Sequence, residues 1–252
     1  MNFIVFGVVA PIAYFILRFL VKRLVMNFLQ NLKRNTNIKN MTKCENCEMF
    51  FSEEDIKFVE GRNICNKPEC KNIKIISGSL GGRTIKTTQN RNLKPTPARV
   101  REQIFSWLRP IKEDSVCLDL FAGSGSLGIE AFSNGAKKVV FIEQNQELYN
   151  ILYRNCQNLK ILSEVKLHKQ SAENYIRRTK EAIFDLIFLD PPFNKNYINL
   201  LLPKIISDFS RTGTLIYIEE SNFNFSDYDR ELKLLKETSS GNSFGRLFEV
   251  RQ

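Results

Sequence analysis

The chain has 252 residues, of which 43% are hydrophobic and 25% are charged, and its formal net charge is +10. This length suffices for one full domain of about 180 residues and a smaller unit, and the composition excludes wholesale disorder. Because His168 is the only histidine, Ser-His-Asp and Cys-His catalysis are excluded unless that residue is the base. Its position at the end of a short strand-like segment favours a structural or surface role.

The positive charge is unevenly distributed along the chain. Residues 71–110 hold nine Lys and Arg residues and a single acid, Glu102, whereas residues 111–252 hold 18 basic and 19 acidic residues. A basic stretch beside a nearly neutral region favours a polyanionic partner held at a defined place, and the alternative is a solvated surface run.

The chain begins with an apolar segment. Residues 1–17 carry no charge, and Arg18, Lys22 and Arg23 follow them. Such a run is at the lower length limit for crossing a bilayer, about 17 residues, and basic residues after it would keep the remainder in the cytoplasm. We expect residues 1–29 to form a hydrophobic helix with membrane attachment through residues 1–25. An interfacial amphipathic helix and a helix packed on the protein are the alternatives.

A polar linker is predicted over residues 30–43, and a cysteine module follows over residues 44–72. Cys44 and Cys47 form one close pair, and Cys65 and Cys70 form a second. Two pairs at this spacing can place four thiolates tetrahedrally around Zn²⁺, so the module is predicted to resemble a zinc ribbon. Other metal or redox use and free thiols are the alternatives. The isolated Cys117 and Cys156 are predicted to be small buried residues.

From residue 73 onward, strand and helix signals alternate. Apolar runs predict strands at residues 116–120, 138–143, 184–189 and 213–218, and short strands are predicted at 74–76, 83–85 and 165–168. Helical spacing is present at residues 99–108, 129–133 and 148–159. This alternation predicts a parallel α/β sheet covered by helices on both faces.

A glycine-rich turn follows the first long strand. In the segment from Asp119 to Gly128, glycines at 123, 125 and 128 allow a tight turn and a close approach of the backbone to a nucleotide-type cofactor. Glu143 ends the next strand, where a carboxylate can accept both hydroxyls of a ribose. A purely structural turn is the alternative.

A second motif, Asp190-Pro191-Pro192-Phe193, lies at the carboxyl end of a buried strand, where open α/β sheets bind their ligands. Consecutive prolines stiffen the loop, which then presents two acceptors, the Asp190 carboxylate and the Pro191 carbonyl. Two fixed acceptors can orient an exocyclic amino group without a histidine base. Phe193 offers an aromatic face on which a base can stack.

These two motifs together resemble the amino-group methyltransferases that use S-adenosylmethionine. That group includes base methyltransferases of DNA and RNA and glutamine methyltransferases of release factors. Because the last class usually has Asn at the position of Asp190, the aspartate favours a nucleobase substrate. The stretch from Ile75 to Gly82-Arg83 and the block from Leu93 to Leu108 narrow the resemblance to the RsmD family, which methylates guanine N2 of 16S ribosomal RNA.

The resemblance implies a seven-stranded, doubly wound, Rossmann-like methyltransferase domain over residues 74–252. Lys94 departs from the family, which usually has Arg there, and Ser171 stands where Asn or Asp is common. The resemblance assigns catalysis to Asp190, Pro191, Pro192 and Phe193. It assigns cofactor binding to Asp119, Phe121, Gly123, Gly125, Glu143, Ser171 and Ala172. It assigns RNA binding to Arg83, Arg91, Lys94, Arg99 and Arg101.

We therefore expect an enzyme that methylates guanine N2 in small-subunit rRNA, as naked RNA or in an assembling 30S particle. We expect it to be monomeric and cytoplasmic, with tethering to the inner membrane if residues 1–25 form an anchor. A DNA amino-methyltransferase and a non-catalytic RNA-binding or membrane-tethering protein are the alternatives.

Overall fold

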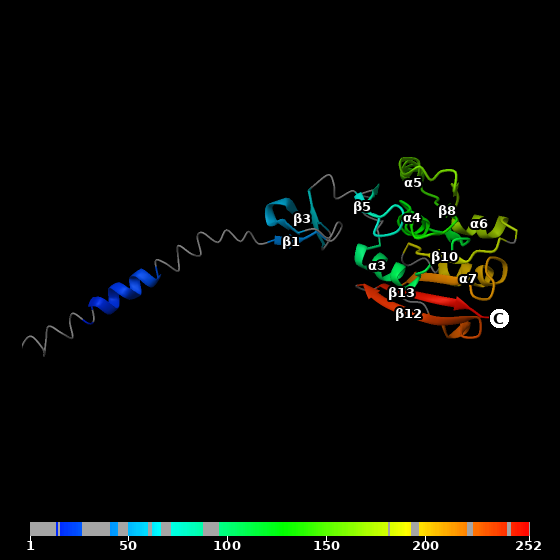
Figure 1. Cartoon of the computed structure of the whole chain (residues 1–252). Coiled ribbons are helices and arrows are strands. Elements are labelled where there is room, and N and C mark those ends of the chain that lie inside the picture. The colour runs from blue at the N-terminus through cyan, green and yellow to red at the C-terminus, as the bar shows by residue number, and fades with distance from the viewer. Residues whose placement is uncertain are drawn as a thin grey trace, which may run out of the picture.

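The structure is a computed structural model. It describes Tyr14 and residues 16–26, 41–44, 50–59, 62–66, 72–87, 96–180, 182–192, 197–220, 224–240 and 243–251. The described residues between 72 and 251 form an α/β body, whose elements are coloured from cyan to red in Figure 1. The predictions for Cys47, Cys70, Arg91, Lys94 and Phe193 lie outside the described residues.

A seven-stranded sheet forms the centre of the α/β body, in the spatial order β12-β13-β11-β10-β7-β8-β9. The strands are β7 (Val116–Asp119), β8 (Lys138–Ile142), β9 (Val165–His168), β10 (Leu186–Leu189), β11 (Leu215–Glu220), β12 (Leu232–Ser240) and β13 (Ser243–Val250). The pairs from β11 through β10, β7 and β8 to β9 are parallel. The expected parallel sheet is thus present in five strands, whereas at one edge β13 pairs antiparallel with both β11 and β12.

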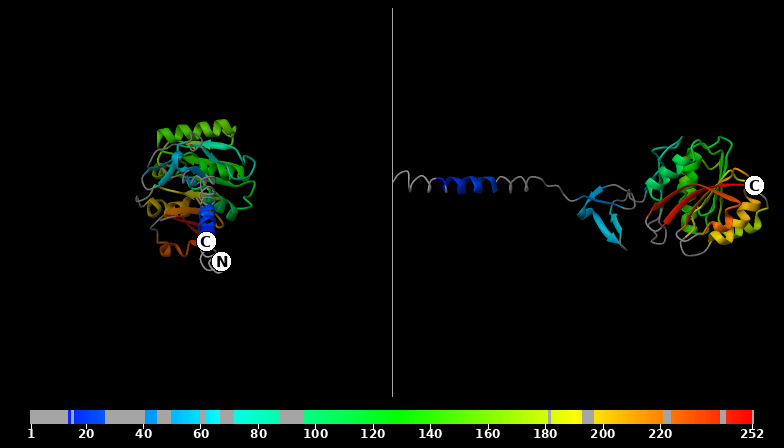
Figure 2. Two further views of the ribbon diagram at one scale, coloured as in Figure 1. Left: turned by 90° about the vertical axis from the view of Figure 1, so that its left-hand side faces the viewer. Right: turned by 90° about the horizontal axis from the view of Figure 1, so that it is seen from below.

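Helices cover both faces of this sheet, as Figures 1 and 2 show. They are α3 (Ala98–Trp107), α4 (Ser126–Ser133), α5 (Gln146–Leu159), α6 (Ala172–Arg178) and α7 (Tyr197–Asp208), with a short 3-10 turn, η4, at Ser226–Tyr228. The doubly wound arrangement expected from the alternation of strands and helices is confirmed.

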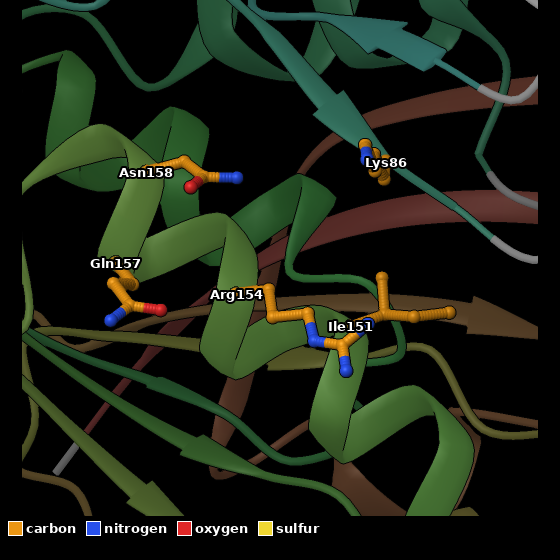
Figure 3. Close-up of a pocket in the computed structure, with 5 residues that line it drawn as sticks. All are labelled: Lys86, Ile151, Arg154, Gln157 and Asn158. Atoms are coloured by element: carbon orange, nitrogen blue, oxygen red, sulfur yellow. The ribbon is translucent and has the colours of Figure 1, made fainter.

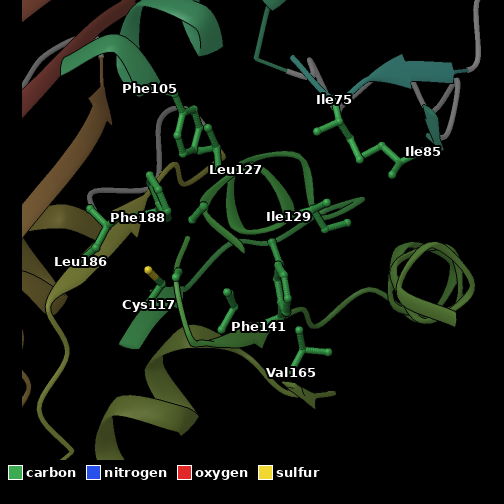
Figure 4. Packing of buried hydrophobic residues seen from close by; sticks show 14 of the residues in the cluster. Ile75, Ile85, Phe105, Cys117, Leu127, Ile129, Phe141, Val165, Leu186 and Phe188 are labelled. Atoms are coloured by element: carbon green, nitrogen blue, oxygen red, sulfur yellow. The ribbon is translucent and has the colours of Figure 1, made fainter. Parts of the chain in front are cut away.

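Alternating side chains of the central strands supply two cores. Cys117, Phe141 and Phe188 face one side, where they join residues of α3, α4 and α5 (Figure 4). Leu118 and Ile187 face the other side and pack with residues of α6 and α7. Because both faces are buried, the strands read as near-continuous apolar runs rather than as alternating ones. Cys117 and Cys156 are fully buried, as expected.

A hairpin of β5 (Asn72–Lys74) and β6 (Thr84–Lys86) precedes α3. Its Ile75 and Ile85 belong to the core on the α4 and α5 side. Gly78 has φ +81°, and a Cβ there would lie 1.8 Å from the backbone oxygen of Ser133. The glycine therefore lets the hairpin approach the end of α4 closely.

The cysteine region folds into two small hairpins. β1 (Met41–Lys43) pairs with β2 (Phe50–Ser52), a 3-10 turn η2 spans Glu53–Asp55, and β3 (Ile56–Val59) pairs with β4 (Arg62–Cys65). The prediction of a linker over residues 30–43 is wrong at its end, because Met41–Lys43 is hydrogen-bonded to β2 as a strand. Its remaining residues lie outside those described.

Near the N-terminus, residues 16–26 are helical and expose large apolar side chains, among them Leu17, Phe19 and Leu24. Within the described part of the chain, no helix combines the length and hydropathy that crossing a membrane requires. Residues 1–13 of the predicted hydrophobic segment lie outside that part.

Candidate active site

Four neighbouring strands of the sheet each end in a carboxylate. Asp119 is the last residue of β7, Glu143 follows β8, Asp190 follows β10, and Glu219 and Glu220 end β11. Since these strands are parallel and adjacent, their carboxyl ends lie along one edge of the sheet. That edge is where open α/β sheets bind ligands.

The glycine-rich turn connects β7 to α4 in a conformation that requires glycine. Gly123 has φ +55° and Gly125, the residue that precedes α4, has φ +91°. A Cβ on Gly123 would meet no atom within 4 Å, whereas one on Gly125 would lie 2.6 Å from Leu152 Cδ1. Gly125 is thus packed against α5, and Gly123 leaves open space in which a ligand can lie against the backbone.

Two buried carboxylates hold this turn in place. Asp119 Oδ2 accepts a hydrogen bond from the Gly128 backbone N–H at 3.0 Å. Glu143 Oε2 accepts one from Gly123 at 2.8 Å, and its Oε1 accepts one from Asn145 at 2.7 Å. Burial raises the pKa of Asp119 to about 7 and also raises that of Glu143, while the backbone N–H donors lower both. The structure thus brings Asp119, Gly123, Gly125 and Glu143 together around the turn, and their contact with a cofactor stays a prediction.

The other predicted cofactor residues occupy supporting positions. Phe121, in the turn, packs against Tyr197 with ring centroids 5.2 Å apart. Ser171 caps the N-terminus of α6, where its hydroxyl accepts from the Asn174 N–H at 3.2 Å, and Ala172 is buried behind it. The structure thus gives Ser171 a role in capping the helix, and its contact with a cofactor stays a prediction.

Asp190, in the loop after β10, lies beside Thr96, to which the sequence assigned no role. The Thr96 hydroxyl donates to Asp190 Oδ2 at 3.2 Å, which links the segment before α3 to the end of β10. Burial and the neighbouring carboxylate of Glu219 raise the pKa of Asp190 well above its ordinary value, and the Thr96 hydrogen bond opposes this. Pro191 is buried and Pro192 is exposed.

Glu219 is a second residue missed at the sequence level. It is buried at the end of β11, and its Oε2 accepts from the Tyr217 hydroxyl at 3.3 Å. The signal available in the sequence was an acidic pair, Glu219-Glu220, directly after an apolar strand. Such a pair marks the carboxyl end of a buried strand in the same way as the Asp190 motif.

A third missed residue, Asn155 on α5, joins three segments. Its Nδ2 donates to the Lys86 and Ser124 carbonyl oxygens, and its Oδ1 accepts from the Lys86 N–H, each at 2.9 Å. Asn155 therefore fixes β6 and the glycine-rich turn to the same helix. Its signal in the sequence was weak, because asparagine in a polar helix is ordinarily exposed.

We expect Asn155→Ala to lower the free energy of unfolding by about 2–3 kcal/mol, because it leaves buried backbone groups of Lys86 and Ser124 without partners. It should also weaken cofactor binding, since Ser124 belongs to the glycine-rich turn. Urea unfolding and isothermal titration with S-adenosylmethionine measure the two effects. Asn158→Ala, an exposed position on the same helix, serves as the control. Equal stability of the two variants would contradict this role.

The predicted RNA-binding arginines fall into different environments. Arg99 is exposed on α3. Arg83 is exposed but donates to the carbonyl oxygens of Asn158 and Leu159 at 2.9 and 3.3 Å, at the C-terminal end of α5. Arg101 is buried, with 2% of its surface exposed, and its Nη1 lies 3.2 Å from Glu130 Oε1. The prediction that Arg101 holds a phosphate is therefore wrong, because its charge is already paired inside the protein.

The cysteine module brings two of its predicted ligands together. Cys44 and Cys65 are both buried, and the Cys65 N–H donates to Cys44 Sγ at 3.3 Å. Phe51, Ile56 and Ile64 pack around them. The described residues contain no group of three or more His, Cys, Asp or Glu side chains placed to hold a metal ion.

Comparison with known proteins places this site in a family. Residues 73–249 match the family described as Conserved hypothetical protein 95. The chain belongs to this family. One relative of the chain is "Ribosomal RNA small subunit methyltransferase D" of Haemophilus influenzae. The two sequences are 37% identical over 180 residues, which cover 70% of this chain and 93% of the relative.

Solved structures agree with the Conserved hypothetical protein 95 assignment. The protein yhhF of Escherichia coli is 30% identical with a TM-score of 0.63, over 71% of this chain and 98% of that one. A methylase-class structure from Haemophilus influenzae is 34% identical with a TM-score of 0.61, over 72% and 99%. Residues 73–249, which match the family, include the α/β body with its row of carboxylates.

Proposed function

We propose that this protein methylates the N2 amino group of guanine in small-subunit ribosomal RNA with S-adenosylmethionine as the methyl donor. The observation that carries the proposal is the placement of Asp190 beside the glycine-rich turn, at the ends of the adjacent strands β10 and β7. The Haemophilus influenzae relative, whose name states methylation of small-subunit rRNA, supports the substrate class.

The residues of the turn suit S-adenosylmethionine. The open space at Gly123 lets an adenosine lie against the backbone, and Glu143, fixed by Gly123 and Asn145, can accept from the ribose hydroxyls. Asp119 supports the turn through Gly128. When bound there, S-adenosylmethionine supplies an activated methyl group on sulfur.

The chain's own contribution to the reaction is chiefly positioning. The Asp190 carboxylate and the Pro191 carbonyl each accept a hydrogen bond from one N–H of the guanine amino group, so that the nitrogen lone pair faces the methyl donor. Thr96 holds the Asp190 carboxylate in orientation. The amine must release one proton on methylation, and a carboxylate with a raised pKa is a suitable acceptor for it.

The direct test is incubation of the purified protein with an in vitro transcript of small-subunit rRNA, with assembling 30S particles, or with duplex DNA. We expect incorporation of radiolabelled methyl into RNA only, and nuclease digestion followed by mass spectrometry should identify N2-methylguanine. Methyl transfer to DNA, or to another position of the base, would overturn the proposal.

The raised pKa of Asp190 predicts a pH dependence. The carboxylate accepts hydrogen bonds best when ionised, so the methylation rate should rise as the pH rises through this pKa. Glu219→Gln removes a negative neighbour that raises the pKa, so it should move this rise to lower pH. The glutamine amide oxygen can still accept from Tyr217. Glu220→Gln should shift the profile less, because Glu220 contributes less to the pKa. Identical profiles in all three proteins would contradict this interpretation.

We also propose that the cysteine module holds one Zn²⁺ through Cys44, Cys47, Cys65 and Cys70. Support comes from Cys44 and Cys65, which the fold brings together, and from the backbone N–H that Cys65 offers to Cys44 Sγ, a contact that favours a thiolate. We expect about one zinc per chain by atomic emission, and loss of the metal in Cys44→Ser and Cys65→Ser. Cys156→Ser, in the α/β body, is the control. If the protein purified from zinc-supplemented cells contained no zinc, this site would be refuted.

A further inference from the structure

A hollow of about 290 Å³ lies between β6 and α5. Figure 3 shows Lys86 on the strand and the other lining residues on the helix facing it. Those residues are Ile151, Arg154, Gln157 and Asn158. The lining thus combines two cations and two carboxamides with one apolar side chain, and it includes no carboxylate.

This chemistry matches a nucleic-acid backbone. Lys86 and Arg154 are exposed and can each donate to phosphate oxygens, and the amides of Gln157 and Asn158 add neutral donors. The apolar Ile151 gives a surface on which a sugar can pack. The hollow is also more spacious than a single inorganic phosphate requires, which favours a phosphate together with its adjoining sugar.

Hydrogen bonds join the two walls of the hollow. Asn155 pairs with both the N–H and the carbonyl of Lys86, and Arg83 donates to the carbonyls of Asn158 and Leu159. These contacts fix β6 against α5 before any ligand binds. A preformed site of this kind loses little entropy when it binds a backbone.

The hollow is also connected to the site of methylation. Asn155 donates to Ser124 in the glycine-rich turn, and Thr96, ten positions after Lys86, donates to Asp190. The helix that forms one wall of the hollow therefore also contacts the turn that we propose holds the cofactor.

We propose that the hollow between β6 and α5 binds the phosphodiester backbone of the substrate RNA, with Lys86 and Arg154 as phosphate ligands. This inference rests on the proposed function. It adds a contact on α5, an element outside the basic stretch of residues 71–110.

The test compares the wild-type protein with the double variant Lys86→Gln/Arg154→Gln. Binding of a fluorescently labelled transcript of small-subunit rRNA is followed by anisotropy over a series of salt concentrations. We expect the variant to bind about 10-fold more weakly and its salt dependence to flatten by about one to two units of slope. The affinity for S-adenosylmethionine and the rate at saturating RNA should stay unchanged.

The double variant Arg177→Gln/Arg178→Gln is the matched control, since it removes two exposed cations from α6, on the opposite face of the sheet. Should Lys86→Gln/Arg154→Gln bind RNA like this control while the wild type binds and methylates the transcript, the inference fails alone. A site for free anions would show a different result: sodium phosphate would displace RNA from the wild type more than sodium chloride does at equal ionic strength, while the variant would bind RNA with unchanged affinity. That result would also overturn the inference. A wild-type protein that binds no RNA would overturn the proposed function together with the inference.

Discussion

Asp190→Ala is expected to lower the methylation rate at least about 100-fold while cofactor binding and folding persist. The substitution removes the carboxylate that accepts from the guanine amine, but it touches neither Glu143 nor the glycine-rich turn. It also removes a partly buried carboxylate whose ionisation is unfavourable, which offsets the lost hydrogen bond from Thr96, so thermal unfolding should shift little. Single-turnover methylation of the rRNA transcript and titration with S-adenosylmethionine measure the two properties separately.

Two further variants distinguish orientation from charge. Asp190→Asn keeps one acceptor oxygen and should retain more activity than Asp190→Ala. Thr96→Val removes the hydroxyl that donates to Asp190 Oδ2 and should reduce the rate by a smaller factor, about 3–10-fold. If Asp190→Ala turned over RNA at a near-normal rate, the assignment of the amine to this loop would be wrong.

Much of the α/β body could be predicted from the sequence because its strands are buried on both faces. Continuous apolar runs predicted β7, β8 and β10 to within two residues. The short segment Val165–His168 predicted β9 at its observed bounds. The carboxylates at the ends of β7, β8 and β10 were predictable for the same reason, since a polar residue directly after a buried strand marks its carboxyl end.

The antiparallel edge was harder to predict. β12 has one side exposed to solvent, and it carries Lys233, Lys236 and Glu237, so it lacks the apolar run that marked the central strands. β13 is held by a long-range contact instead: a Cβ on Gly245 would lie 2.3 Å from the Tyr217 hydroxyl on β11. No local pattern in the sequence records that approach.

Contacts distant in sequence also explain the residues that were missed in the site. Thr96 meets Asp190 across 94 positions, and Asn155 meets Lys86 across 69. Such contacts can be predicted only when the order of the strands in the sheet is known. Arg101 is a different case, because its own helix carried the information: it lies four residues before Phe105 and seven before Leu108, on the apolar face of α3. A cation on the apolar face of a helix indicates an ion pair inside the protein, whereas the basic residues around Arg101 suggested that it binds RNA.

The burial of Arg101 leads to the largest expected effect on stability. Arg101→Ala should lower the free energy of unfolding by about 3–5 kcal/mol, because it leaves the Glu130 carboxylate buried without its cation. The Arg101 side chain also donates to the Lys74 carbonyl at 3.1 Å, so the β5–β6 hairpin loses a contact with α3. Arg99→Ala, two residues away and exposed, should change stability by less than about 0.5 kcal/mol. Urea unfolding of the two variants makes the comparison.

The pH dependence of this loss identifies its cause. Burial raises the pKa of Glu130 and Arg101 lowers it, so removal of Arg101 raises that pKa further. A carboxyl whose folded-state pKa lies above its unfolded value stabilises the fold when protonated, and this contribution is lost as the pH rises through the folded-state pKa. The deficit of Arg101→Ala should therefore shrink in acid. The double variant Arg101→Met/Glu130→Gln should be less destabilised than Arg101→Ala at neutral pH, because the glutamine oxygen can still accept from the Ile76 N–H without a buried charge. An Arg101→Ala protein that unfolds like the wild type but binds rRNA more weakly would show instead that this arginine contacts RNA.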